Sequence, residues 1–142
     1  MSEANKKVAL EFLDAMSVAD VQRQERCLAP DAFTITKGFG KVSGRRDRAT
    51  MLATVGAFKE IVPTGFRPKI EKVIAEGDNV VIEFEGNAVL GNGKPYCNQY
   101  VFVFTLKDGK IKQLNEYFCT ILADETIYPL LMQKGEKLAH GS

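Results

Sequence analysis

Hydrophobic residues recur at steps of three and four along the first half of the chain. Between Glu3 and Met16 they fall on one stripe, which predicts an amphipathic helix. A shorter helical pattern covers Ala19–Leu28 and ends before Pro30, since proline forces the residue before it towards extended conformations. A third stripe runs through Met51–Phe58. The first half therefore predicts three helices.

The pattern changes to strict alternation in the second half. Turn sequences "GDN", "GNG" and "KDGK" separate the alternating segments, and their Gly and Asn residues tolerate positive φ. The pattern predicts an antiparallel meander of four strands at Phe66–Glu76, Val80–Leu90, Tyr96–Leu106 and Ile111–Leu122.

Three further segments complete the expected topology. "DAFTIT" (31–36) predicts an additional strand, and the Gly-rich, charged segment 37–48 predicts a mobile flap with solvated arginines. The tail predicts a short helix over Pro129–Gln133 followed by frayed last residues.

This order of elements predicts one α+β domain over residues 1–142. The helices come first, and a curved antiparallel sheet wraps round them to form a cone with an internal pocket. The strand Tyr96–Leu106 is apolar on both faces, with Val101 and Val103 opposing Tyr100 and Phe102. Helices cover only one side of such a sheet, so we expect a homodimer through the other side.

Charge and composition exclude several classes of protein. The 19 Lys and Arg nearly balance the 18 Asp and Glu, so no overall field favours nucleic acid. The apolar runs are shorter than the ~20 residues of a membrane span, and "MSEANKK" lacks the apolar part of a secretory signal. We expect a cytoplasmic protein that binds no membrane. The odd set Cys27, Cys97 and Cys119 has no metal-type spacing and predicts reduced thiols.

The segments "VALEFLDAM", "LAPDAFTI" and "YVFVFTLKDGKIKQLNEYF" carry a resemblance that spans nearly the whole chain. In this order they resemble the nuclear transport factor 2-like superfamily, and within it the SnoaL-like and limonene-1,2-epoxide hydrolase-like group. The resemblance implies the cone fold. It leaves the reaction open, because the superfamily includes isomerases, cyclases, epoxide hydrolases and non-catalytic binders.

The resemblance also implies site residues. The epoxide hydrolases of this group place one acid before "YF" in the last strand, which corresponds to Glu116. Their Arg-x-Asp pair corresponds to Glu83 and Glu85, so Glu83 reverses the sign of the arginine. Their Tyr-x-Asn pair, which helps to hold a water, corresponds to Thr34 and Thr36.

Strand alternation separates Glu116 from its neighbours. Side chains two residues apart share a face, so Leu114, Glu116 and Phe118 point one way, opposite to Asn115 and Tyr117. The alignment places the Glu116 set in the pocket. It adds the substrate-binding candidates Glu83, Asn87, Asn98, Tyr100, Thr34, Thr36 and Phe118.

The candidate chemistry is acid/base catalysis by Glu116 and Glu85. Two carboxyls in an apolar site acquire different pKa values, so one removes a proton while the other donates one. Glu83 adds a third acid, either in the same network or as a cation ligand, but the spacing fits no EF-hand loop and we expect no metal. Cys119 has no base, because the only histidine, His140, lies in the tail. We expect that thiol to serve packing, in the core or at an interface.

Two functions remain open at this point. The first is an enzyme that needs no cofactor and hydrolyses an epoxide or isomerises an enolisable ketone, with a small, apolar, oxygenated substrate. Tyr100 would then steady the oxyanion. The second is a non-catalytic module of the same fold that binds a ligand or a protein.

Overall fold

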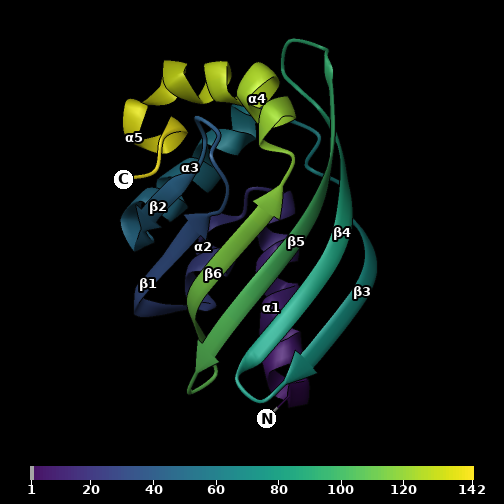
Figure 1. The fold of residues 1–142 in the computed structure, drawn as a ribbon, viewed down its shortest axis with the longest axis vertical. Helices are drawn as coiled ribbons and strands as arrows, with labels where there is room; N and C mark the ends of the chain where they lie inside the picture. The colour runs from purple at the N-terminus through teal and green to yellow at the C-terminus, as the bar shows by residue number, and fades with distance from the viewer. Residues whose placement is uncertain (1) are drawn as a thin grey trace.

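The computed structural model describes residues 2–142 as five helices and six strands. The helices are α1 (Ser2–Ser17), α2 (Val21–Arg26), α3 (Arg48–Ile61), α4 (Thr120–Lys134) and α5 (Glu136–Ala139). The strands are β1 (Leu28–Thr36), β2 (Gly44–Asp47), β3 (Lys69–Glu76), β4 (Asn79–Val89), β5 (Pro95–Lys107) and β6 (Lys110–Phe118). Figure 1 shows the sheet in front of α1 and α3.

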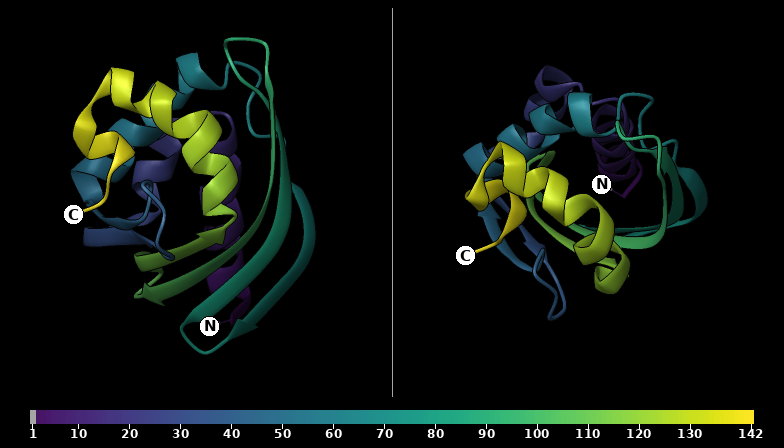
Figure 2. Two further views of the ribbon diagram at one scale, coloured as in Figure 1. Left: turned by 45° about the horizontal axis from the view of Figure 1, so that its top comes forward. Right: turned by 90° about the horizontal axis from the view of Figure 1, so that it is seen from above.

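The six strands form one sheet in the order β2-β1-β6-β5-β4-β3. Only β1 and β6 run parallel, and every other neighbouring pair is antiparallel. The sheet curves without closing, and its concave side holds α1 while α4 crosses one end (Figure 2). The predicted α+β fold, with a curved sheet wrapped round N-terminal helices, is confirmed.

Helix α1 fills the concave side of the sheet. Its apolar stripe includes Phe12 and Leu13, each 1% exposed, and the Phe12 ring meets the edge of Phe104 with centroids 5.6 Å apart. Burying such rings is the main stabilising contribution in a domain of this size. A second cluster around Ala123, Ile127 and Leu131 packs α4 over the far end of β4 and β5.

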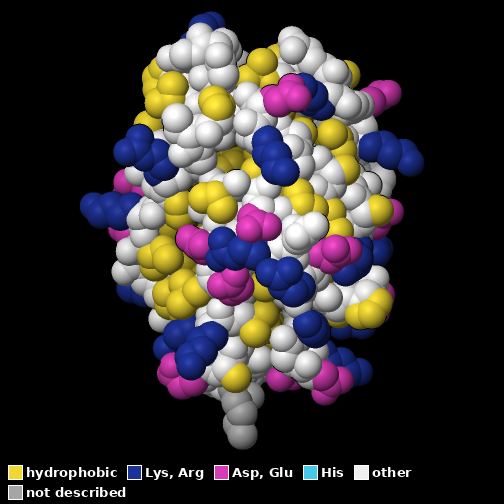
Figure 3. All heavy atoms as spheres, turned by 180° about the vertical axis from the view of Figure 1, so that it is seen from behind, with side chains coloured by type: hydrophobic (Ala, Val, Ile, Leu, Met, Phe, Trp, Pro, Cys, Tyr) yellow, Lys and Arg dark blue, Asp and Glu magenta, His cyan; other side chains and the backbone are white. Residues whose placement is uncertain are grey.

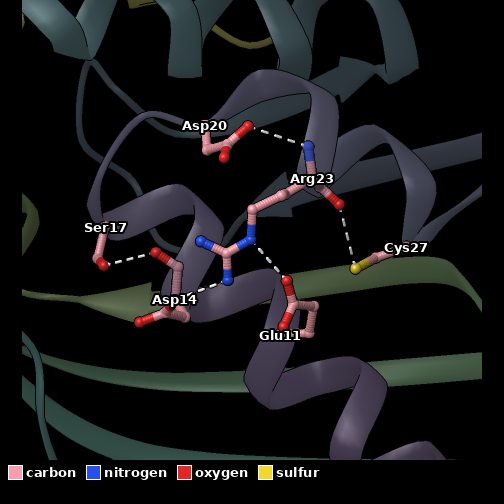
Figure 4. Close-up of polar contacts among 6 residues, drawn as sticks. All are labelled: Glu11, Asp14, Ser17, Asp20, Arg23 and Cys27. Atoms are coloured by element: carbon pink, nitrogen blue, oxygen red, sulfur yellow. Dashed lines mark hydrogen bonds and ion pairs between the residues drawn. The ribbon is translucent and has the colours of Figure 1, made fainter.

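Arg23 fixes the corner between α1 and α2 (Figure 4). Its Nε donates to Glu11 Oε1 and its Nη2 to Asp14 Oδ2, both over 2.7 Å. The Asp20 carboxylate caps α2 by accepting from the Arg23 backbone N–H. Since Arg23 points outwards, the opposite side of this short helix faces the interior, where Gln24 is 1% exposed.

Two predicted element boundaries were wrong. Segment 37–48 contains the short strand β2, which pairs with β1, and the strand predicted to reach Leu122 ends at Phe118. Helix α4 follows at once and is longer than the predicted Pro129–Gln133. Ala123, Ile127 and Leu131 recur every four residues and form its buried side, whereas the first part of this run also matches a strand pattern.

The structure places the flap and the tail on the body of the protein. Asp124 of α4 accepts from the backbone N–H groups of Lys41 and Val42, and Val42 is buried. Backbone hydrogen bonds run both ways between Arg45 and Ser142. Ala139 is fully buried, instead of belonging to a frayed tail.

The helical side of the protein carries acidic and basic side chains interspersed over its surface (Figure 3). Hydrophobic groups are scattered between them. Among residues 2–142, no helix is both long enough and apolar enough to cross a membrane.

Candidate functional site

A cavity of about 110 Å³ lies between the concave side of the sheet and helices α1, α3 and α4. Its wall is mostly apolar and includes the aromatic residues Phe12, Phe58, Phe66, Phe84, Phe102 and Phe118. An apolar cavity with a few polar groups is the usual form of a small-molecule site. The polar groups therefore indicate its chemistry.

Glu116 is the one acidic side chain of this wall among the described residues. It lies on β6 opposite Phe102 of β5 and beside Thr36 of β1. Its Oε1 accepts from the Thr36 hydroxyl over 3.1 Å, and the same hydroxyl accepts from Arg46 Nη1 over 3.1 Å. The carboxylate and the guanidinium thus share one threonine instead of forming a direct ion pair.

Burial raises the pKa of the Glu116 carboxyl above its ordinary value. The positive charge of Arg46, followed by the hydrogen bond from Thr36, acts in the opposite direction and only partly offsets burial. Glu116 as a residue is half-buried and lines the cavity. It can therefore exchange a proton with a bound molecule in a range closer to neutrality than an ordinary glutamate.

Arg46 is a site residue that the sequence analysis missed. It is 6% exposed, and its Nε and Nη2 donate to the carbonyls of Leu138 and Ala139 over 3.1 and 2.9 Å. Burial lowers the pKa of Arg46, and Glu116 raises it. In the alternation of β2, Arg46 points inwards and Arg45 outwards, where it stacks on Phe33.

Two tyrosines complete the polar wall. The Tyr96 hydroxyl accepts from Asn98 Nδ2 over 3.0 Å, and Tyr100 lines the same cavity. Burial raises the pKa of both phenols, that of Tyr100 well above its usual value. Both phenols stay protonated at neutral pH. Each protonated phenol has one hydrogen that it can donate to a ligand.

The structure brings together five of the predicted site residues. Those that line the cavity are Glu116, Thr34, Thr36, Tyr100 and Phe118. Asn98 is buried behind them, where its amide holds Tyr96 and the backbone of Cys119.

Glu83, Glu85 and Asn87 were predicted to face the pocket, and this prediction was wrong. Phe84 pairs with Tyr100, so the inward residues of β4 are the even-numbered ones. The match of Glu83 and Glu85 to the family's Arg-x-Asp pair was one residue out on this strand. An error of one residue moves every side chain of a strand to the opposite face. Glu83 and Glu85 instead line a groove on the outer face with Glu71. Among residues 2–142, no three His, Cys, Asp or Glu side chains form a group that could hold a metal ion.

Cys119 is exposed and occupies the N-cap position of α4, where its side chain makes no capping hydrogen bond. It therefore does not pack in the core, one of the two packing roles that the sequence suggested, and packing at an interface stays a prediction. We expect Cys119→Ser to raise the free energy of unfolding by up to about 1 kcal/mol, because serine caps helices well. Turnover should stay at the wild-type level. Urea titration and a kinetic assay measure both quantities, and a loss of turnover in a folded variant would assign the thiol to the chemistry.

Comparisons with known proteins agree with this geometry. The SnoaL-like domain family matches residues 9–114. The fold is shared with a limonene epoxide hydrolase-like (LEH-like) epoxide hydrolase from M. tuberculosis, with a TM-score of 0.73, 21% identity and coverage of 94% of this chain and 96% of that one. No curated protein matches the chain.

Two further structures show how widely the fold is used. A candidate SnoaL-like polyketide cyclase from Jannaschia sp. CCS1 has a TM-score of 0.70 at 20% identity, covering 89% of this chain and 92% of that one. A candidate ketosteroid isomerase from Kribbella flavida DSM 17836 has a TM-score of 0.63 at 17% identity, covering 82% and 78%. At these identities the likeness establishes the nuclear transport factor 2-like fold alone. Because the family match covers most of the protein, the chain belongs to the SnoaL-like domain family.

Proposed function

We propose that this protein is a cofactor-independent enzyme that performs acid/base chemistry on a small, apolar, oxygenated molecule held in the cavity. The observation that carries the proposal is the Glu116 carboxyl, whose pKa burial raises and which faces an apolar cavity beside two neutral phenols. A base with a pKa nearer to neutrality, next to hydrogen-bond donors, suits proton transfer at carbon.

The preferred reaction is isomerisation of an enolisable ketone. The Glu116 carboxylate removes a proton from the carbon next to the carbonyl, and the electron pair moves onto the carbonyl oxygen. A phenol in the cavity wall, Tyr96 or Tyr100, donates a hydrogen bond to this enolate oxygen. The Glu116 carboxyl then returns the proton to a different carbon, which leaves the enzyme unchanged.

A second candidate reaction is hydrolysis of an epoxide, supported by the Arg46–Thr36–Glu116 chain of hydrogen bonds. Glu116 would take a proton from an attacking water while a phenol donates to the epoxide oxygen, so that water and epoxide give a diol. Glu85 does not take part, because it lies on the outer face of β4.

The test is conversion of a panel of small monocyclic β,γ-unsaturated ketones and epoxides by the wild-type protein, followed by chromatography. We expect conversion of the ketones to their conjugated isomers, or of the epoxides to diols. Ligands that bind in the cavity and return unchanged from every incubation would contradict the proposal and support the non-catalytic binding module.

The outer face of the sheet supports a second proposal, a homodimer. Val81, Val101 and Val103 are half-buried there, Tyr117 is 44% exposed, and no element among residues 2–142 covers them. We expect sedimentation equilibrium at micromolar concentration to give about twice the 15.7 kDa mass of the chain.

A charge on this face should abolish the dimer. Val103→Glu places a carboxylate in the middle of the face and should give monomers, because an unpaired charge is costly to bury. Val18→Glu is the matched control, since Val18 is 59% exposed at the end of α1 on the helical side. A wild-type protein that sediments as a monomer at these concentrations would exclude the homodimer.

A further inference from the structure

Gln24 is a polar side chain of the cavity wall that the proposed chemistry does not use. It lies on α2 one turn after Val21, is 1% exposed, and contributes to the lining of the cavity. None of residues 2–142 donates a hydrogen bond to its Oε1 atom. Buried amide oxygens nearly always have such a donor, so this one requires an explanation.

The threonine hydroxyls of the wall cannot supply the donor. The Thr54 hydroxyl donates to the Thr50 carbonyl over 2.8 Å, and the Thr34 hydroxyl donates to the Leu114 carbonyl over 2.9 Å. The Thr36 hydroxyl donates to Glu116. A hydroxyl has one hydrogen to donate, so all three threonines are already committed.

Gln24 lies towards the opposite end of β6 from Glu116. The carbonyl of Cys27, three residues after Gln24, accepts from the N–H of Ile111 near the start of β6. Glu116 is five residues further along this strand than Ile111, so Gln24 and Glu116 reach the cavity wall from different levels of β6. The cavity wall between them includes Leu114 and Phe102, which are apolar. Gln24 and Glu116 are therefore separate polar groups of the cavity wall, with apolar side chains between them.

We propose that Gln24 determines specificity by accepting a hydrogen bond from a hydroxyl or N–H group of the ligand, at the end remote from the oxygen that Glu116 and the phenols act on. This inference rests on the proposed function. The ligand class is a molecule with two polar ends, such as a ring that carries a ketone or epoxide on one side and a hydroxyl on the other.

The test compares two ligands that differ in one hydroxyl, 4-methylcyclohexanone and 4-(hydroxymethyl)cyclohexanone. Isothermal titration calorimetry with the wild-type protein should give about tenfold tighter binding of the hydroxymethyl compound, since a site that forms this hydrogen bond disfavours the analogue that lacks it. Gln24→Met keeps the length of the side chain but removes the amide. It should abolish or reverse the preference.

Thr54→Val is the matched control, because it removes another polar group of the wall whose hydrogen is already committed. It should leave the ratio of the two affinities unchanged. The side-chain amide signal of Gln24 in the wild-type NMR spectrum gives a second measurement that requires no variant. It should shift with the hydroxymethyl compound and much less with the methyl compound.

Several outcomes would overturn the inference. These are wild-type binding without a preference for the hydroxyl, absence of binding by either compound, an unchanged preference in folded Gln24→Met, or an unshifted Gln24 signal in the bound protein. Glu116→Gln separates the inference from the proposed function. If Glu116→Gln still binds the hydroxymethyl compound more tightly, the role of Gln24 is supported. If the wild-type protein at the same time converts no ketone or epoxide, the catalytic proposal is refuted while the role of Gln24 stands.

Discussion

Glu116→Gln should slow turnover by about 100-fold or more, the usual scale for removing a positioned acid or base. Glutamine keeps the size of the side chain and can still accept from the Thr36 hydroxyl, but it cannot take up a proton. We therefore expect the fold and ligand binding to persist while kcat falls. The measurement is kcat and KM of the wild type and the variant on whichever panel substrate the wild type converts.

Glu85→Gln is the matched control for this experiment. It makes the same chemical change in the same sheet, but on the outer face of β4, so kcat should change little. Had both acids served one proton path, as the sequence suggested, the two substitutions would give similar losses. Wild-type turnover in folded Glu116→Gln would place the chemistry elsewhere in the cavity.

The raised pKa of Glu116 also predicts how the activity and the stability of the wild-type protein depend on pH. Activity needs the carboxylate, so kcat/KM should rise with pH through a midpoint above the ordinary glutamate value of about 4.3. Burial raises the folded-state pKa above the unfolded-state value, so the folded state binds the proton more tightly. The free energy of unfolding therefore falls as pH rises between the two values, and Glu116→Gln should lack this fall.

The sequence predicted the positions of the main elements because hydrophobic spacing reports burial directly. Helix α1 and the strands β4 and β5 lie within a few residues of the predicted ranges. The prediction that the Glu116 side chain faces the pocket was also correct. Leu114 and Phe118, two residues away on either side, line the same cavity.

Other parts of the site depend on contacts that a single sequence does not display. The face of β4 is fixed by the pairing of Phe84 with Tyr100, and the alignment could not detect an error of one residue. Arg46 is buried only because the backbone of the tail returns to bind it. Gln24 gave a local signal, since it shares the inward stripe of α2 with Val21, where an apolar residue is usual.

Arg46→Met should lower the free energy of unfolding by about 3 kcal/mol, because it removes charge-assisted hydrogen bonds to two backbone carbonyls and to Thr36. The variant should also carry a higher pKa at Glu116, since the positive charge of Arg46 is the largest influence that lowers it. The midpoint of the kcat/KM profile would then move to higher pH. Urea titration and the pH profile measure these two effects separately.

Arg45→Met is the matched control, one residue away on the same strand. Arg45 is exposed and stacks on Phe33 at 4.1 Å, a contact worth about 0.5–1 kcal/mol at the surface. We expect this variant to keep the wild-type pH profile and most of the stability. If Arg46→Met folds with an unchanged midpoint, the Arg46 charge does not act on Glu116 through Thr36, and Arg46 serves only to hold the tail against β2. If instead both arginine variants shift the profile equally, the effect comes from the net charge of the protein and not from the buried guanidinium beside the carboxylate.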